Sequence, residues 1–441
     1  MLVVMEFVML PATAWVGLSG MGIALWRLKS RKRMLEWVTA AEADYEPLPL
    51  EQHATHGRLG AMLRRASHDL KTPEPDAGDI QTLLNMIEGS KMPLVLVGGG
   101  VIRSKGAVPE FRKFVETLGA PVASTIMGGG ACPGNHRLFT GMIGMHGSHA
   151  SNLASDQCDL LIAVGCRFSD RVATDPATFA PNAKIVHIDI DRAEIDKNVL
   201  TDHHIIGDAK AVLDLLNPKL PQYSHPEWKE QVLPLRVPSV AETGDKLTPK
   251  QVLETIRRLA PQDTIVATDV GQHQMWSIQH FHFDYPGQLL TSGGFGTMGF
   301  GLGAAIGAKL GNPDKVVVHT TGDGCFRMNC HELATVEHYH LPIITVVFNN
   351  GTLGMVRQWQ NLIYHQRYSE TTLDRGPDFV KLAEAYGLKG FRVTSMAEME
   401  AAFQEALTAG CGCVIDCRLD MDEMVRPMVA GGAHITDFLL K

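Results

Sequence analysis

Apolar residues in the first half of this chain occur in short unbroken runs, separated by stretches with helical periodicity. Helical periodicity is clear near 108–118 and 209–216, and the mainly apolar stretches that predict strands lie at 93–97, 121–125, 159–165 and 184–190. Strands without a polar face, separated by helices, are typical of a parallel sheet covered on both faces. Residues 79–217 are therefore expected to form one doubly wound α/β domain.

The same pattern begins again after a proline-rich stretch. Residues 218–247 are predicted to be an extended connector, since they contain Pro218, Pro221, Pro226, Pro234 and Pro238. Thr248 is a typical helix N-cap, and Pro249 suits the first helical position. Further apolar runs, at 264–268, 315–319, 343–348 and 413–418, predict strands of a second domain over 248–441. The expected fold is thus α/β, with two doubly wound parallel-sheet domains.

The N-terminal segment, 1–78, does not continue this pattern. Residues 7–26 contain no charged side chain, and Arg27, Lys29, Arg31, Lys32 and Arg33 follow. An uncharged run of this length can span a bilayer, with the following chain on the cytoplasmic side. The alternatives are an apolar helix that packs on another surface, or a misassigned start. The rest of the segment, up to about residue 78, is polar and is predicted to be a linker.

Composition narrows the class of protein. The chain has 441 residues, is 45% hydrophobic and 20% charged, and has a net charge of −8, so it fits an ordinary α/β protein and gives no reason to expect a nucleic-acid partner. Its eight cysteines lack a disulfide-scaffold pattern, which favours a reducing cytoplasm. The one cysteine cluster lies in a predicted buried strand, with a zinc site as the less favoured alternative: Cys411, Cys413 and Cys417.

Two short motifs indicate the chemistry. Gly322-Asp323-Gly324 follows one predicted strand, and Asn349-Asn350 follows the next. Ligands bind at the carboxyl ends of such strands, and one carboxylate, the Asn350 amide oxygen and the Thr352 backbone carbonyl would suit Mg²⁺ shared with a substrate phosphate. Each motif alone is also compatible with a simple turn. The pair at this spacing predicts a thiamine diphosphate (ThDP) site.

Over roughly residues 80–436 the chain resembles the catalytic subunit of acetolactate synthase (acetohydroxyacid synthase), a family of ThDP enzymes. The stretches that carry the resemblance include TDVGQHQMW (268–276), TSGGFGTMGFGLGAAIGA (291–308) and FNNGTLGMVRQWQ (348–360). Many such segments in the same order make the resemblance specific to this family.

The resemblance implies roles for individual residues. Mg²⁺ would be bound by Asp323, Asn350 and the Thr352 carbonyl. Met298 would hold ThDP in its bent form, although by itself it could be ordinary core packing. The cofactor would be contacted by Gly271, Gln272, His273, Gly296, Met298, Gly322, Gly324 and Cys325, the last of which replaces the family's usual serine.

The substrate pocket is implied in the same way. Trp359 matches the position that favours 2-ketobutyrate over pyruvate as the second substrate, and Met355 lines the same pocket. Arg171 matches the arginine that meets the carboxylate of the second 2-keto acid, for which its planar guanidinium is suited. Without the resemblance, Trp359 and Met355 would be ordinary buried residues and Arg171 a surface partner of Asp170.

The first domain resembles the family's FAD-binding middle domain, where FAD has a structural role. Ser169 stands where the family usually has aspartate, so flavin contact is implied less firmly than ThDP contact. The matching positions are Gly98, Gly99, Thr125, Met127, His146, Gly147, Gly165, Arg167, Arg171, Asp189 and Ile190.

Residues 1–75 do not resemble the family's pyrimidine-binding domain, which supplies the glutamate that activates ThDP. We therefore expect a carboligase that converts pyruvate and a 2-keto acid to a 2-acetohydroxy acid and CO₂ in branched-chain amino acid biosynthesis, completed by a pyrimidine domain from another chain. The expected assembly is a homo-oligomer, with room for a regulatory small subunit. The alternatives are a non-catalytic module that binds ThDP or FAD, and another ThDP-dependent decarboxylase or carboligase.

Overall fold

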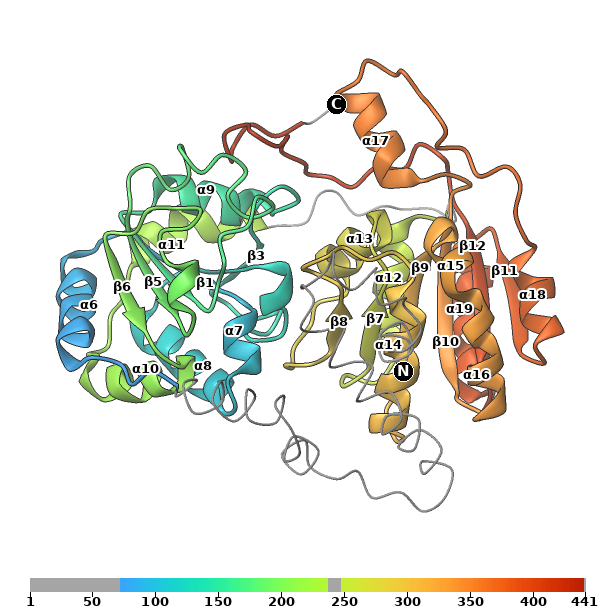
Figure 1. Cartoon of the computed structure of the whole chain (residues 1–441), viewed down its shortest axis with the longest axis horizontal. Helices are drawn as coiled ribbons and strands as arrows, with labels where there is room; N and C mark the ends of the chain where they lie inside the picture. Colours follow the sequence, from blue (N-terminus) through green and yellow to red (C-terminus); the bar gives the residue numbers. More distant parts are fainter. Residues whose placement is uncertain (1–71, 237–246, 440–441) are drawn as a thin grey trace, which may run out of the picture. The chain divides into compact units, whose positions relative to one another are not determined.

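The computed structural model describes residues 72–236 and 247–439, and Pro73–Lys441 forms one compact unit. Two parallel six-stranded sheets organise this part of the chain, with helices between their strands (Figure 1). The predicted α/β fold with two parallel-sheet domains is confirmed. Residues 1–71, including the candidate membrane anchor at 7–26, lie outside the described residues. Within them, no helix is both long and apolar enough to cross a bilayer.

The first sheet has the strand order β3-β2-β1-β4-β5-β6. Its strands are β1 (Pro93–Val97), β2 (Val122–Ser124), β3 (Phe139–Met142), β4 (Leu160–Val164), β5 (Lys184–Asp189) and β6 (His203–Ile206). The helices of this domain are α6 (Ala77–Gly89), α7 (Gly99–Arg103), α8 (Ala107–Leu118), α9 (His149–Gln157), α10 (Ala209–Leu216) and α11 (Pro226–Val232). The chain reverses its direction across the sheet between β1 and β4, and ligands bind at such a switch point.

The second sheet has the order β11-β12-β10-β9-β7-β8, so its switch point lies between β7 and β9. Its strands are β7 (Ile265–Thr268), β8 (Leu289–Thr291), β9 (Val317–Gly322), β10 (Ile343–Asn349), β11 (Lys389–Val393) and β12 (Cys413–Arg418). Its helices are α12 (Pro249–Leu259), α13 (Gln272–His280), α14 (Phe300–Gly311), α15 (Asp323–Asn329), α16 (Leu333–His338), α17 (Gly354–Leu362), α18 (Phe379–Ala385) and α19 (Met396–Thr408).

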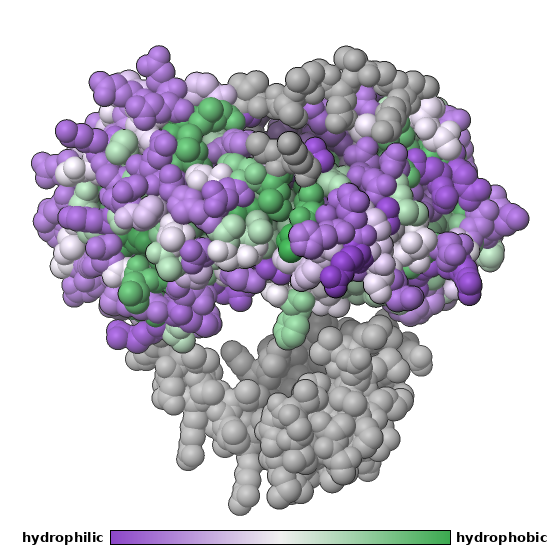
Figure 2. Space-filling view, turned by 90° about the horizontal axis from the view of Figure 1, so that it is seen from above, coloured by the Kyte–Doolittle hydropathy of each residue, from purple (hydrophilic) through white to green (hydrophobic). Residues whose placement is uncertain are grey.

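Both faces of each sheet are buried, which explains the unbroken apolar runs. In β1, Val95 and Val97 pack into one core cluster and Leu94 and Leu96 into another. The residues of β10 divide between two clusters in the same way. Full burial of one such side chain contributes about 1.5–3 kcal/mol. On the face that Figure 2 shows, hydrophilic residues cover most of the described part, and apolar residues are confined to smaller areas.

Eight of the strands follow the predicted runs, whereas β3, β6, β8 and β11 were not predicted. All four are edge strands of their sheets. An edge strand is shorter or more polar because one of its sides lacks a partner strand, as in the sequence HHII of β6. The apolar-run signal therefore finds the central strands and misses the edges.

The prediction of an extended connector over 218–247 is wrong for residues 226–236. Pro226–Val232 is a helix, α11, with Pro226 at its start, and Leu233–Arg236 continues as a 3₁₀ turn. The buried Trp228 explains this, because its indole Nε1 donates to the Pro93 carbonyl at 3.0 Å and its ring packs on the first sheet. Proline at a helix start removes no needed hydrogen bond. Residues 237–246 lie outside the described part.

Candidate functional site

A cavity of about 1980 Å³ lies within the compact unit, and loops that follow strands of both sheets line it. Much of the predicted site meets at its wall. The predicted residues that line the cavity are Gly99, Thr125, Met127, His146, Gly165, Arg167, Arg171, Gly271, Gly296, Met355 and Trp359. The predicted metal ligands are not on this wall.

Asp323 and Asn350 follow two neighbouring strands. β9 and β10 pair in parallel, with Gly322 opposite Phe348, so Asp323 and Asn350 leave the sheet at the same edge. Asp323 is buried, and its Oδ2 has no hydrogen-bond partner among the described residues. Burial raises the pKa of this carboxyl to about 6, although Arg327 and the Gly324 amide lower it. A buried carboxylate oxygen without a partner is costly, so this one suits a bound cation.

The loop after Asn350 is held in place by its own hydrogen bonds. Thr352 forms a bridge to Thr372, and its Oγ1 donates to the Thr371 carbonyl at 2.8 Å. The Asn350 Nδ2 donates to Gln272 Oε1 at 3.1 Å. The loop is thus tied to a second segment and to the start of α13.

His273 lies in the first turn of α13. Burial lowers the pKa of its imidazole to about 4, so the ring is neutral near pH 7, and its Nε2 has no partner among the described residues. Gly271, just before the helix, has φ +152°, and a Cβ on Gly322 would lie 2.9 Å from His273 Nδ1. A neutral imidazole and the amides at a helix start can both donate to a phosphate oxygen.

The Gln272 side chain is already fully engaged by the protein. Its Nε2 donates to Gln358 Oε1 at 2.9 Å and to the Glu423 carbonyl at 2.8 Å, and its Oε1 accepts from Asn350. Only its backbone amide remains for the diphosphate contact that the sequence predicts.

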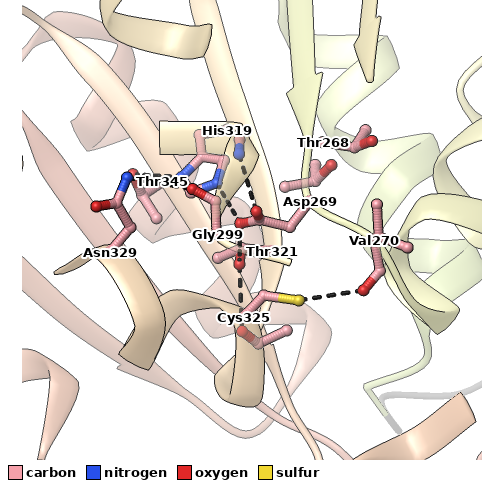
Figure 3. Close-up of polar contacts among 12 residues, drawn as sticks. Thr268, Asp269, Val270, Gly299, His319, Thr321, Cys325, Asn329 and Thr345 are labelled. Atoms are coloured by element: carbon pink, nitrogen blue, oxygen red, sulfur yellow. Dashed lines mark hydrogen bonds and ion pairs between the residues drawn. The ribbon is translucent and has the colours of Figure 1, made fainter. Parts of the chain in front are cut away.

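A buried polar network that the sequence analysis missed underlies these loops (Figure 3). Asp269 Oδ2 lies 3.0 Å from His319 Nε2 and accepts from Thr321 Oγ1 at 2.7 Å, and its Oδ1 accepts from the Gly301 amide at 2.8 Å. Burial alone would raise the pKa of Asp269, but the hydrogen bond and charge of His319, with the Gly301 amide, lower it to about 2. The network joins β9 and the start of α14 to the end of β7. Its signal in the sequence was the polar run of His319, Thr320 and Thr321 within a strand that is otherwise predicted to be buried.

The predicted cofactor residues near Gly324 pack closely together. A Cβ on Gly324 would lie 3.7 Å from Met298 Cε, so Met298 reaches the loop after β9. Gly296 has φ +64°, which favours glycine. The Cys325 Sγ donates to the Val270 carbonyl at 3.1 Å, and burial raises the pKa of this thiol to about 12 (Figure 3). Cys325 is therefore a packing and hydrogen-bonding residue, not a reactive thiol.

At the first switch point, the backbone is packed against itself. A Cβ on Gly98 would lie 2.0 Å from the Gly165 carbonyl oxygen, and Gly165 has φ +60°. His146 is buried, with its pKa lowered to about 4 by burial and its Nδ1 without a described partner. The predicted FAD residues that do not line the cavity are Gly98, Gly147, Asp189 and Ile190.

The predicted substrate residues reach the cavity from separate elements. Met355 and Trp359 lie on α17, one turn apart. Arg171 also lines the cavity, but its side chain is mostly exposed and pairs with Asp170 at 2.8 Å, which is the surface ion pair that the sequence left as its alternative. Cys413 and Cys417 lie in the predicted strand β12, and no group of three His, Cys, Asp or Glu residues in the described ranges could hold a metal.

The fold and these loops define the chain as a thiamine pyrophosphate enzyme. Residues 80–216 match the model of the central domain of these enzymes, and residues 269–417 match that of their C-terminal TPP-binding domain. The chain belongs to the acetolactate synthase large-subunit family, as the sequence resemblance implied.

Its relatives include the acetolactate synthase isozyme 2 large subunit of Escherichia coli, 41% identical over 399 residues, which are 89% of this chain and 71% of the relative. The probable acetolactate synthase large subunit of Methanocaldococcus jannaschii is 45% identical over 372 residues, which are 82% of this chain and 63% of that protein. The acetolactate synthase large subunit of Lactococcus lactis is 41% identical over 364 residues, 82% of this chain and 63% of the relative. The chain thus spans less than two thirds of the length of several of its relatives.

Proposed function

We propose that this chain forms the diphosphate- and Mg²⁺-binding half of a carboligase that converts pyruvate and a second 2-keto acid to a 2-acetohydroxy acid and CO₂. The observation that carries this proposal is the buried Asp323 Oδ2, which has no hydrogen-bond partner among the described residues and lies at the same sheet edge as Asn350. Together with the family, it supports a site for Mg²⁺ and a pyrophosphate tail. The pathway that this product suits is branched-chain amino acid biosynthesis.

The residues present fit the cofactor. Asp323, Asn350 and the Thr352 carbonyl would hold Mg²⁺, an all-oxygen set that Mg²⁺ prefers. His273 Nε2 and the backbone at Gly271 and Gln272 would bind the diphosphate, as would the loop of Gly322, Gly324 and Cys325. Met298 and Gly296 would border the thiazolium ring. When bound, ThDP supplies the electron sink for decarboxylation and carboligation.

The substrate residues would contact different parts of the second 2-keto acid. Arg171 would exchange Asp170 for the carboxylate of the second 2-keto acid, which a guanidinium binds through two parallel hydrogen bonds. Trp359 and Met355 would pack against the alkyl group of that acid and exclude water around it. Selection of 2-ketobutyrate over pyruvate would then depend on the apolar contact that one additional methylene makes.

The site is proposed to be completed by a pyrimidine domain from another chain, in a homo-oligomer. Phe295 supports this proposal, because its side chain lies on the cavity wall and is 100% exposed. An apolar side chain in this position gains free energy when another domain covers it. The names of the relatives, which are large subunits, support a regulatory small subunit as a further partner.

FAD is proposed as a structural cofactor of the first domain. The close contact of Gly98 with Gly165 leaves backbone, not side chains, facing the switch point, and His146 Nδ1 lacks a described partner. These features fit a bound dinucleotide. We further propose a cytoplasmic location, with membrane attachment through residues 7–26 as the alternative.

An acetolactate assay on the full chain, with and without a separately expressed pyrimidine domain, tests the proposed activity. We expect acetolactate only when both are present. ThDP binding without activity in either condition would favour the second candidate, a non-catalytic ThDP-binding module. A decarboxylase of another family branch would instead release an aldehyde.

A further inference from the structure

Three buried carboxamides form a continuous chain next to the proposed metal site. Asn350 Nδ2 donates to Gln272 Oε1 at 3.1 Å, and Gln272 Nε2 donates to Gln358 Oε1 at 2.9 Å. All three side chains are buried. At the end of this series of hydrogen bonds, the Gln358 side chain bonds the backbone of Val425.

The backbone of Val425 determines which way each amide points. The Val425 N–H donates to Gln358 Oε1 at 2.8 Å, and its carbonyl accepts from Gln358 Nε2 at 3.0 Å. A backbone N–H can only donate and a carbonyl can only accept, so the Gln358 amide has one orientation. The Gln272 atom that lies 2.9 Å from this oxygen must therefore be a donor, which is Nε2. The same nitrogen also donates to the Glu423 carbonyl at 2.8 Å, which fixes Gln272 independently.

The consequence reaches Asn350. Because Gln272 Nε2 faces Gln358, Gln272 Oε1 faces Asn350. This oxygen can only accept, so the Asn350 atom that contacts it must be the donor Nδ2. The Asn350 Oδ1 is then the atom left for a ligand. If the amide were reversed, two oxygens would face each other at this contact, and a nitrogen would face the metal.

We infer that Gln272 and Gln358 are positioning residues that orient the Asn350 carboxamide so that its oxygen faces Mg²⁺. The inference rests on the proposed function, since it assigns the orientation of a proposed Mg²⁺ ligand. It also links the metal loop to α17, because Gln358 precedes Trp359 on that helix. The metal loop, the helix of the substrate pocket and the segment 423–425 therefore share one hydrogen-bond chain.

Gly354 supports this arrangement. A Cβ at this position would lie 1.9 Å from Gln272 Oε1 and 2.7 Å from Asn350 Nδ2, so any side chain here would separate the two amides. Its φ is not in the left-handed region. The space for the amide contact, not backbone conformation, is therefore what this glycine provides.

The test is the Mg²⁺ concentration required for ThDP binding to the full chain, measured by titration calorimetry. We expect Gln272→Met to raise the half-saturating Mg²⁺ concentration by about tenfold or more, because the Asn350 amide is then free to turn. Gln358→Met should raise it less, because the Glu423 carbonyl still holds Gln272 Nε2. Gln288→Met is the matched control, since Gln288 is equally buried but bonds backbone groups at Asp284, Tyr285, Gln262 and Thr264. It should leave the Mg²⁺ requirement unchanged while losing comparable thermal stability.

A double-mutant cycle separates orientation from general damage. In Asn350→Asp both terminal atoms are oxygens, so neither can donate to Gln272 Oε1, and adding Gln272→Met removes an oxygen–oxygen contact and should not raise the Mg²⁺ requirement. A Mg²⁺ requirement that is unchanged in Gln272→Met, or raised equally in both backgrounds, overturns the inference alone. A wild-type chain that binds no ThDP at any Mg²⁺ concentration overturns the proposed function as well.

Discussion

His319 Nε2 lies 3.0 Å from Asp269 Oδ2, and both side chains are buried beneath the loops that carry the proposed cofactor site. His319 belongs to β9 and Asp269 follows β7, the two strands at the switch point of the second sheet. The pair therefore ties together the two strands from which the GQH and GDG loops begin. Its geometry sets the relative position of those loops.

Substitution Asp269→Ala should lower the free energy of unfolding by about 3–5 kcal/mol, because it leaves His319, Thr321 and the Gly301 amide buried without their partner. Urea denaturation measures this change. Glu400→Ala is the control, since it breaks the exposed ion pair with Arg258 and should leave the urea midpoint nearly unchanged. Equal effects of the two substitutions would contradict the assignment of Asp269 as a structural anchor.

Stability should decline in mild acid because of buried histidines. Burial lowers the pKa values of His146, His273 and His280 from 6.5 to about 4. Between these values the unfolded chain binds protons that the folded chain does not, so the free energy of unfolding falls as the pH drops through this window. The free energy of unfolding should have its full value above pH 6.5, the ordinary pKa of these groups. Urea midpoints between about pH 7.5 and about pH 4.5 test this.

A matched variant identifies the source of that pH dependence. His146→Gln removes one of the three groups and should make the decline shallower. His331→Gln is the control, because His331 is largely exposed and lies near Glu332 only at 3.8 Å. Stability that rises toward acid, or a slope that both variants leave unaltered, would contradict the explanation.

The sequence predicted the central strands and the ligand loops because both depend on local signals. An unbroken apolar run such as 343–348 indicates a strand buried on both faces, and Asp323 and Asn350 followed from their positions after such runs. The edge strand β6 and the helix α11 were not predicted, since they are determined by tertiary contacts such as that of Trp228 with Pro93. The partners of Asp269 are distant in sequence, at His319 and Thr321, and no single-sequence pattern reveals such a contact.

The same limit applies to Gln272. Its place in the GQH motif suggested a direct cofactor role, whereas its side chain bonds Gln358 and Glu423, far along the chain. The motif identified the right loop, but the task of the side chain depended on contacts between segments. Arg171 shows the converse, because the sequence left a substrate role and an ion pair open and the side chain both pairs with Asp170 and lines the cavity.

Gly98→Ala should abolish FAD binding while ThDP binding persists. The new Cβ would lie 2.0 Å from the Gly165 carbonyl oxygen, so the loops after β1 and β4 must move apart. Loss of quenching of flavin fluorescence reports FAD release, and calorimetry reports ThDP. Gly89→Ala is the control, because no atom lies within 4 Å of a Cβ at that position. FAD retention by Gly98→Ala would remove the first switch point from the proposed flavin site.

Trp359→Leu should reduce the preference for 2-ketobutyrate over pyruvate in the enzyme reconstituted with a pyrimidine domain. Trp359 lies on the cavity wall on α17, and its ring would contact the additional methyl group of 2-ketobutyrate. One methylene in an apolar pocket is worth about 1–3 kcal/mol, so the product ratio should shift by about tenfold or more. The turnover number with pyruvate alone should change little, since pyruvate as the second substrate lacks the carbon that the indole would contact. The ratio of acetohydroxybutyrate to acetolactate, measured with both acids present, decides the matter. A ratio equal to that of the unaltered chain would place the selective contact elsewhere, with Met355 the next side chain on the same helix face to vary.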